Sequence, residues 1–172
     1  HSVELTYAGQ DVAVTETATS FVNERQKVKI SLEKILEQDE IFGIGKNNEI
    51  KNISFGLYAK EDVVSSSGTV IPADGLIEII TLDENEAATA NTDLPLGSYY
   101  IKEIATDEHY ILSDIQYPFT FKYAGQDTET VEIKVNDGKP IENKLIYGSV
   151  SGKKIDENGE VLGGALIGIF KI

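Results

Sequence analysis

Three polar side chains lie at positions where strand-like segments otherwise carry apolar residues, on the side of each strand that should face the core. Their functional groups could react with one another there. They are the amine of Lys34, the carboxyl of Glu103 and the carboxamide of Asn143. Side chains at every second position of a strand face the same side. The apolar residues of matching parity are Val28, Ile30 and Leu32 beside the lysine, Tyr99 and Ile101 beside the glutamate, and Ile141, Leu145 and Tyr147 beside the asparagine. An amine, a carboxyl and a carboxamide on inward rows indicate either a buried polar network or a reaction.

The elements that must position these groups are β-strands. Apolar and polar residues alternate through 119–123 and again through 131–135, and both runs are bounded by turn residues such as Gly, Asn or Asp. This alternation is typical of half-buried antiparallel strands that place one face on a core. We therefore predict an all-β chain.

The composition excludes several classes of function. The chain has 172 residues, of which 41% are hydrophobic, and a formal net charge of -14. This length suits one domain with parts of its neighbours, and the negative charge argues against nucleic acid as a partner. Cysteine is absent, which removes disulfides, thiol nucleophiles and thiolate metal ligands. No stretch has the length of a spanning helix, so we expect no membrane insertion, and we expect no metal or cofactor.

An internal repeat organises the chain. The pentapeptide YAGQD occurs at 7–11 and again at 123–127, so its two copies are 116 positions apart. Polar residues of the same types recur downstream with an offset of 120 positions: Asn23 with Asn143, and Lys34 with Lys154. The repeat unit therefore has the size of one small domain.

This repeat divides the chain into three parts. Residues 1–26 are predicted to be the closing strands of a preceding unit, 27–146 a complete unit, and 147–172 the opening strands of a following unit. Asn23 and Lys154 would then be the equivalents of the network residues in those neighbouring units, separated from their partners. The alternative is that a single sandwich includes all 172 residues and that the repeat is coincidental.

Three further segments identify a family resemblance. They are LPLGSYYIKEI at 94–104, ISFGLYAKED at 53–62 and GSVSGKKIDENGEVLGGALIGIFK at 148–171. These segments resemble Cna B-type domains, also called SpaA-like or prealbumin-like domains, of Gram-positive surface adhesins and pilins. The resemblance implies an Ig-like, prealbumin-like antiparallel β-sandwich.

The resemblance also implies a spontaneous isopeptide bond between Lys34 and Asn143, assisted by Glu103. Burial would favour the neutral amine that can attack a carboxamide, and it would favour a protonated Glu103 that can relay protons as ammonia leaves. The sequence departs from the family because Leu36 replaces the acidic residue usual two places after the lysine. Lys29 is therefore a competing lysine, although strand parity favours Lys34. The alternative is an unreacted network of the same three side chains.

The sequence thus predicts a structural stalk module rather than a turnover enzyme. Its location would be extracellular, on the cell wall of a Gram-positive bacterium, and its partners would be tandem neighbouring domains of the same protein. The alternative function is a module of the same fold that binds a host matrix protein or glycan through the connections at 61–75 and 83–93. Neither connection contains an aromatic residue, which favours the stalk.

Overall fold

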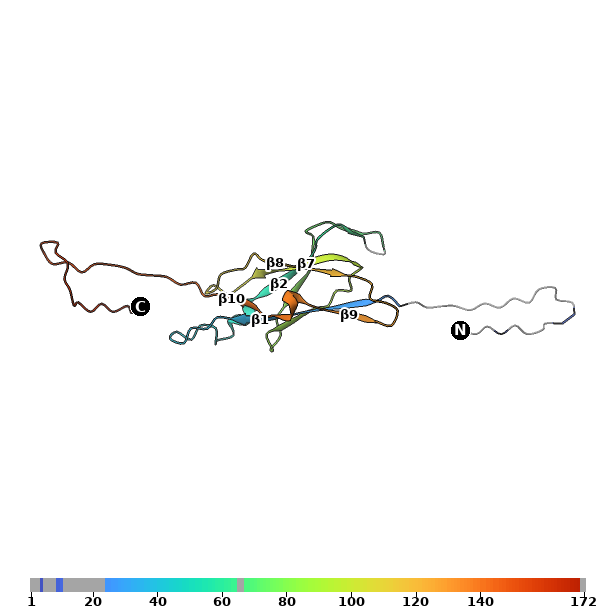
Figure 1. The fold of residues 1–172 in the computed structure, drawn as a ribbon, viewed down its shortest axis with the longest axis horizontal. Helices are drawn as coiled ribbons and strands as arrows, with labels where there is room; N and C mark the ends of the chain where they lie inside the picture. The colour runs from blue at the N-terminus through green and yellow to red at the C-terminus, as the bar shows by residue number, and fades with distance from the viewer. Residues whose placement is uncertain (1–3, 5–8, 11–23, 65–66, 171–172) are drawn as a thin grey trace.

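Two four-stranded β-sheets pack against each other and enclose the core (Figure 1). The computed structural model describes residues 4, 9–10, 24–64 and 67–170. The first sheet consists of β1 (Lys27–Leu36), β6 (Ala87–Ala90), β9 (Thr130–Lys134) and β10 (Ile141–Asn143). The second sheet has the order β5 (Leu76–Thr81), β2 (Ser54–Ala59), β7 (Gly97–Ala105) and β8 (Gln116–Phe121). A small ribbon of β3 (Val63–Val64) and β4 (Val70–Ile71) and two 3-10 helices, η1 (Glu49–Asn52) and η2 (Val135–Gly138), complete the described elements.

Strand β1 organises the first sheet because it pairs with three other strands. It runs antiparallel to β6 and parallel to both β9 and β10. Strand β9 pairs along residues 27–31 and β10 along residues 34–36. Between these two strands, Asn136 and Asp137 in η2 adopt left-handed backbone with φ of 55° each, a conformation that Asn and Asp tolerate better than most residues. This turn leads the chain from one half of β1 to the other.

The predicted all-β sandwich is confirmed, and most of its strand pairs are antiparallel. The two parallel pairings of β1 are a feature that the sequence did not indicate. Alternation shows which face of a strand is buried, but it does not show the direction of the neighbouring strand.

The core is built by the inward rows of both sheets. Phe55 of β2 and Tyr99 of β7 are completely buried, and the hydroxyl of Tyr99 donates a 2.7 Å hydrogen bond to the carbonyl of Pro95. The buried ring therefore has a partner for its polar group, as burial requires. The other buried apolar residues of the cluster are Ile30, Leu32, Ile53, Leu57, Ala59, Val63, Ile80, Ala88, Ala90, Leu94, Ile101, Phe121, Val135 and Ile141.

Residues 148–170 extend away from one end of the sandwich (Figure 1). An antiparallel bridge joins Ile155 to Val161, and the turn between them is held by the carboxylate of Asp156, which accepts from the amides of Asn158 and Glu160. DENG at 156–159 thus forms a hairpin turn. Asn23 and most of the first YAGQD copy lie outside the described residues.

One inward row is shorter than predicted. Ile141, Asn143 and Leu145 are buried, but Tyr147 has 69% of its surface exposed, so its predicted place on that row is wrong. Strand β10 ends at Asn143, and beyond the single bridge of Leu145 to Tyr110 the chain leaves the sandwich. Beyond Leu145, the alternation of apolar and polar residues therefore no longer indicates which residues are buried in this core.

Neither of the 3-10 helices in the described part of the chain is long and apolar enough to cross a membrane.

The core predicts that alanine substitutions at two apolar positions in neighbouring strands have very different effects on the free energy of unfolding. We expect Phe55→Ala to lower the free energy of unfolding by about 3–5 kcal/mol, because it opens a cavity at a fully buried site. Ile79→Ala in β5, where 57% of the residue's surface is exposed, should change it by about 0.5 kcal/mol or less. Urea unfolding of both variants measures the difference, and similar losses would contradict this description of the core.

Candidate functional site

Lys34, Glu103 and Asn143 meet inside the sandwich, and each has only 1% of its surface exposed. Lys34 lies in β1 and Asn143 in β10, which pairs beside it in the same sheet. Glu103 lies in β7 of the opposite sheet, directly across from Phe55 on β2. The three side chains therefore connect the first strand, the last strand and the facing sheet.

The contacts place the amine against the carboxamide. The Nζ atom of Lys34 donates to Oδ1 of Asn143 at 2.6 Å and lies 3.6 Å from Oε1 of Glu103. The Nδ2 atom of Asn143 donates to Oε1 and Oε2 of Glu103 at 2.8 and 3.0 Å. Glu103 also accepts the backbone N–H of Ser113 at 3.0 Å. The carboxyl group thus lies beside both partners of a possible amide exchange.

Burial changes the protonation of the amine. Desolvation lowers the pKa of Lys34, and it outweighs the opposing attraction of the carboxylates of Glu103 and Glu142. An apolar surrounding disfavours the ammonium form, so the neutral amine is more accessible here than in water. Only that neutral form has the lone pair that a nucleophile needs.

The other predicted lysines and asparagine are not part of this network. Lys29 is exposed on the opposite face of β1, where it pairs with Glu132 in register, so the structure brings Lys34 and not Lys29 to Asn143. Lys154 is exposed in the segment beyond the sandwich. Asn23 lies outside the described residues.

The sequence of this chain matches a known protein family. Its sequence matches the SpaA family, a prealbumin-like fold domain, over residues 42–139, which is more than half of the 172 residues. The chain belongs to this SpaA family. Glu103 lies within the matched span, while Lys34 and Asn143 lie just outside its two ends.

Several solved structures of bacterial proteins align with this chain. The pilus 2b backbone protein of group B streptococcus is 18% identical, with a TM-score of 0.43 over 77% of this chain and 47% of that one. The minor pilin GBS52 of Streptococcus agalactiae is 18% identical, with a TM-score of 0.44 over 75% of this chain and 49% of that one. The Bacillus anthracis TIE protein is 17% identical, with a TM-score of 0.44 over 81% of this chain and 24% of that one. The chain therefore spans less than half of each. No curated protein sequence matches it.

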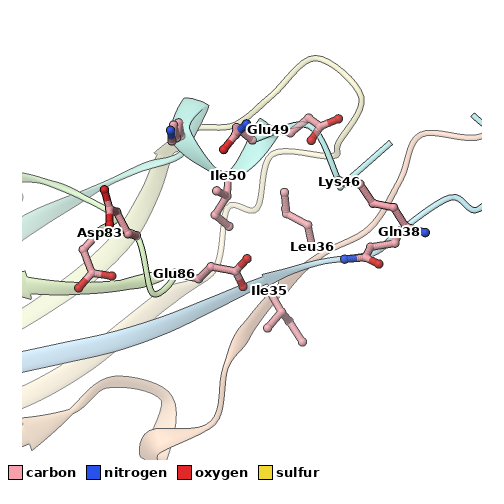
Figure 2. Close-up of a pocket in the computed structure, with 12 residues that line it drawn as sticks. Ile35, Leu36, Gln38, Lys46, Glu49, Ile50, Asp83 and Glu86 are labelled. Atoms are coloured by element: carbon pink, nitrogen blue, oxygen red, sulfur yellow. The ribbon is translucent and has the colours of Figure 1, made fainter. Parts of the chain in front are cut away.

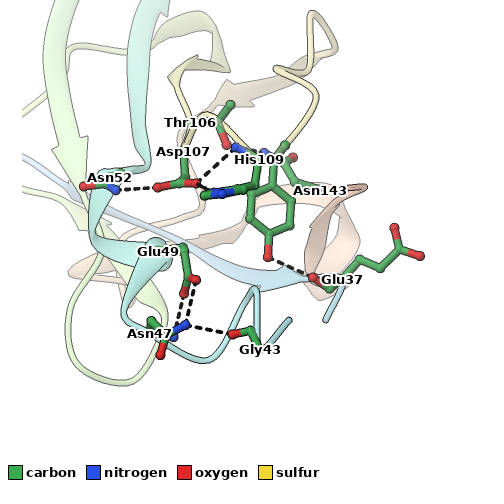
Figure 3. A network of polar contacts seen from close by, with 10 residues as sticks. Glu37, Gly43, Asn47, Glu49, Asn52, Thr106, Asp107, His109 and Asn143 are labelled. Carbon is green, nitrogen blue, oxygen red and sulfur yellow. Dashed lines mark hydrogen bonds and ion pairs between the residues drawn. The ribbon is translucent and has the colours of Figure 1, made fainter. Parts of the chain in front are cut away.

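A fourth polar residue touches the network in this SpaA-family domain. Thr106, directly after β7, accepts a hydrogen bond from Nδ2 of Asn143 at 2.9 Å (Figure 3). Strand alternation did not predict its inward position, because a β-bulge separates it from Glu103. Phe55 pairs with Glu103 and Ser54 pairs with Ala105, so Ile104 is an extra residue in β7. A bulge of this kind re-aims the side chains that follow it.

The turn after Thr106 is fixed by a second group of hydrogen bonds (Figure 3). The carboxylate of Asp107 accepts from Nδ2 of Asn52 at 2.6 Å and lies 2.6 Å from Nδ1 of His109. Desolvation opposes ionisation of Asp107, but its hydrogen bonds from His109 and Asn52 outweigh this effect and lower its pKa. The charged carboxylate therefore anchors the turn.

A cleft of about 540 Å³ lies near one end of β1, but it is separate from the buried network (Figure 2). Leu36 and Ile50 form part of its wall, and Glu49, Asp83 and Glu86 contribute carboxylates. None of the three buried network residues lines it. Within the described ranges, no group of three or more His, Asp or Glu side chains is arranged to hold a metal ion.

The pair of Asp107 and His109 predicts a pH-dependent stability. The hydrogen bond that the His109 ring donates to the Asp107 carboxylate is the main cause that raises the pKa of His109, and the charges of Glu108 and Glu49 act in the same direction. A raised pKa stabilises the fold fully below the unfolded pKa of about 6.5, and this contribution is lost as pH rises through the folded value. We expect His109→Gln to lower Tm at about pH 5.5 and to change it little at about pH 9. An equal decrease at both pH values, measured by thermal unfolding, would contradict this assignment.

Proposed function

We propose that this chain is a structural stalk module of a Gram-positive surface adhesin or pilin-like protein, stabilised by an isopeptide bond between Lys34 and Asn143. The observation that supports it is the 2.6 Å contact between the Lys34 amine and the Asn143 carboxamide, inside the core and beside Glu103. An amine held this close to a carboxamide has already lost the translational freedom that makes the reaction slow in water.

The first step is a proton shift within the buried pair. Two opposite charges in an apolar core lose more hydration than a neutral pair does. Transfer of one proton from the Lys34 ammonium to the Glu103 carboxylate removes both charges. The resulting neutral amine can attack Cγ of Asn143, while the protonated carboxyl group remains beside the amide as a general acid.

The remaining steps balance without water or a cofactor. Attack by Nζ forms the new bond to Cγ and leaves a proton in excess on Nζ. Glu103 carries this proton to Nδ2, the bond between Cγ and Nδ2 breaks, and ammonia leaves with the bonding electron pair. The products are an amide between Lys34 and Asn143, one ammonia and a protonated Glu103, which becomes a carboxylate again when its proton leaves with the ammonia as ammonium. Fixed geometry of this kind can supply effective molarities on the order of 10⁵ M or more.

The bond would join the first strand of the sandwich to its last. The linked residues are 109 positions apart, and by the loop-entropy relation used for disulfides a loop of about 100 residues is worth roughly 4.7 kcal/mol. Tension that enters at β1 and leaves at β10 would pass through this bond instead of through the sheet hydrogen bonds. This property suits a stalk that must resist extension.

With the proposed domain boundaries, the segments on either side of the sandwich are parts of further stalk units. In this scheme residues 27–146 are one complete unit, 1–26 close the preceding one, and 147–172 open the next. The exposed apolar residues of the last segment support this proposal, because residues such as Ile167 and Phe170 have 73% and 86% of their surfaces uncovered. Lys154 and Asn23 would be linked only in the neighbouring units, so tandem domains are the expected partners.

The mass of the intact chain tests the proposed bond. We expect the purified, denatured protein to lack the mass of one ammonia relative to its sequence, because the amide exchange releases one molecule per domain. Lys34→Ala and Glu103→Ala should each restore the full sequence mass. Lys29→Ala is the matched control on the same strand and should retain the deficit. A wild-type mass equal to that of the sequence would refute the bond.

Stretching of single molecules tests the mechanical role. The bond would exclude the 109 positions between Lys34 and Asn143 from extension. At about 3.4 Å per residue, Glu103→Ala should release roughly 370 Å more chain than wild type when the domain unfolds under force. Lys29→Ala should match wild type. Equal extensions of wild type and Glu103→Ala would show that the domain is not cross-linked between these strands.

A further inference from the structure

One end of the sandwich carries large apolar side chains that solvent reaches, and we call it the apolar end. It is the end at which β1 and β10 finish and from which the chain continues into residues 148–170 (Figure 1). Its exposed apolar residues have between 50% and 83% of their surfaces uncovered, and they are Ile41, Phe42, Ile111, Leu112, Ile146 and Tyr147. Single exposed apolar residues are normal on a protein surface, whereas a group of them marks a surface that a partner covers.

Backbone pairing joins two parts of this group. Tyr110 and Leu145 face each other in an antiparallel bridge, and both are buried. The amide of Ile111 donates to the carbonyl of Lys144 at 3.0 Å, so the pairing extends beyond the bridge. Neighbouring residues of an extended segment point to opposite sides. Ile111 and Ile146 therefore lie on the outer side of the bridge, away from the core.

The third part of the group is a hydrogen-bonded turn beside this bridge. The carboxylate of Asp39 accepts from the amides of Ile41 and Phe42 at 2.8 and 2.7 Å. The hydroxyl of Tyr110 donates to the carbonyl of Glu37 at 2.9 Å, which attaches the start of the turn to the bridge. In Figure 1 the turn projects from the same end of the sandwich as the C-terminal segment. A surface that is ordered before it binds loses little conformational entropy when a partner covers it.

The position of the apolar end determines which partner reaches it. Ile146 and Tyr147 are part of this surface, and the proposed following unit begins at residue 147. The repeat offset of 120 positions, which relates Lys34 to Lys154, leaves no linker between the two units. A folded unit that begins at residue 147 therefore lies directly beside the apolar end.

The opposite end of the sandwich shows which surface a following unit brings. There the side chain of Gln26, directly before β1, accepts from the amide of Ala124 at 2.9 Å. Ala124 belongs to the second YAGQD copy, at 123–127, whose Tyr123 has 60% of its surface exposed. The same pentapeptide occurs at 7–11, in the segment assigned to the preceding unit, so consecutive units share this loop. Tyrosine is enriched where protein surfaces meet, and this loop therefore suits a contact with apolar side chains.

We propose that the apolar end of this unit docks onto the opening end of the following unit, at the loop equivalent to 123–127. This inference rests on the tandem arrangement in the proposed function. Domains joined by a small polar interface move relative to each other, whereas a large apolar interface holds them in one orientation. The contact makes each joint of the stalk stiff, so the array resists bending as well as extension.

A chain in which one unit is duplicated tests this contact. Residues 1–146 are followed by residues 27–172, so only the first copy has a complete unit after its apolar end. The natural chain contains no cysteine, so Phe42→Cys in either copy supplies a single thiol. We expect iodoacetamide to alkylate this thiol about tenfold or more slowly in the first copy than in the second, because alkylation requires the contact to open. The mass gain of the intact chain over time measures both rates.

Ile79→Cys is the matched control. This residue lies within β5, away from the apolar end, and 57% of its surface is exposed. Its thiol should react at the same rate in both copies. Equal rates for Phe42→Cys in the two copies would overturn the docking surface. Equally slow rates in both copies would also overturn it, because a second molecule or residues 147–172 would then cover the apolar end.

The mass of the same duplicated chain tests the proposed function separately. Each complete unit that forms its isopeptide bond loses one ammonia. A deficit of two ammonia molecules with equal alkylation rates would refute the docking surface and leave the bond intact. Slow alkylation of the first copy without any ammonia deficit would support the docking surface and refute the bond.

Discussion

The cost of holding an amine and a carboxyl group in an apolar core determines how the two sheets are arranged. A buried polar network stabilises a fold only when all its members are satisfied. In the described residues, no buried side-chain nitrogen or oxygen lacks a hydrogen-bond partner. Satisfying Lys34 and Glu103 together requires β1 and β7 to face each other, with Asn143 between their polar groups. The network therefore fixes the relative position of the sheets, a condition that apolar packing alone leaves adjustable.

Strand β1 carries both the chemical and the structural consequences of this arrangement. Its inward row supplies apolar side chains at Ile30 and Leu32 and then the amine at Lys34. Its edge accepts β9 first and β10 second, and the second pairing brings Asn143 beside the amine. The left-handed turn in η2 makes this change of partner possible. The reactive groups are thus positioned by regular strand pairing on either side of one irregular turn.

The sequence predicted the sandwich and the three buried polar residues because each lies on a strand whose alternation continues up to it. Lys34 shares the parity of Ile30, and Glu103 shares that of Tyr99, so an inward position could be counted for both. The inward position of Thr106 could not be found by this count, because Ile104 adds one residue to β7 and reverses the parity beyond it. A bulge is set by the pairing with β2, which local alternation does not describe. The misplacement of Tyr147 has a related cause, since the end of β10 depends on the edge of β1 and not on the local residues.

The pairing of β1 with β10 also has a consequence for how this domain folds. Contacts between residues 109 positions apart form only after most of the chain has been ordered, and topologies dominated by such contacts fold slowly. The partly folded chain meanwhile exposes strand edges that can associate with other chains. A covalent closure at this last contact would turn a reversible folding equilibrium into a one-way step. Persistence against proteases that degrade transiently open chains would then depend on a bond that has no return path, instead of on the free energy of folding.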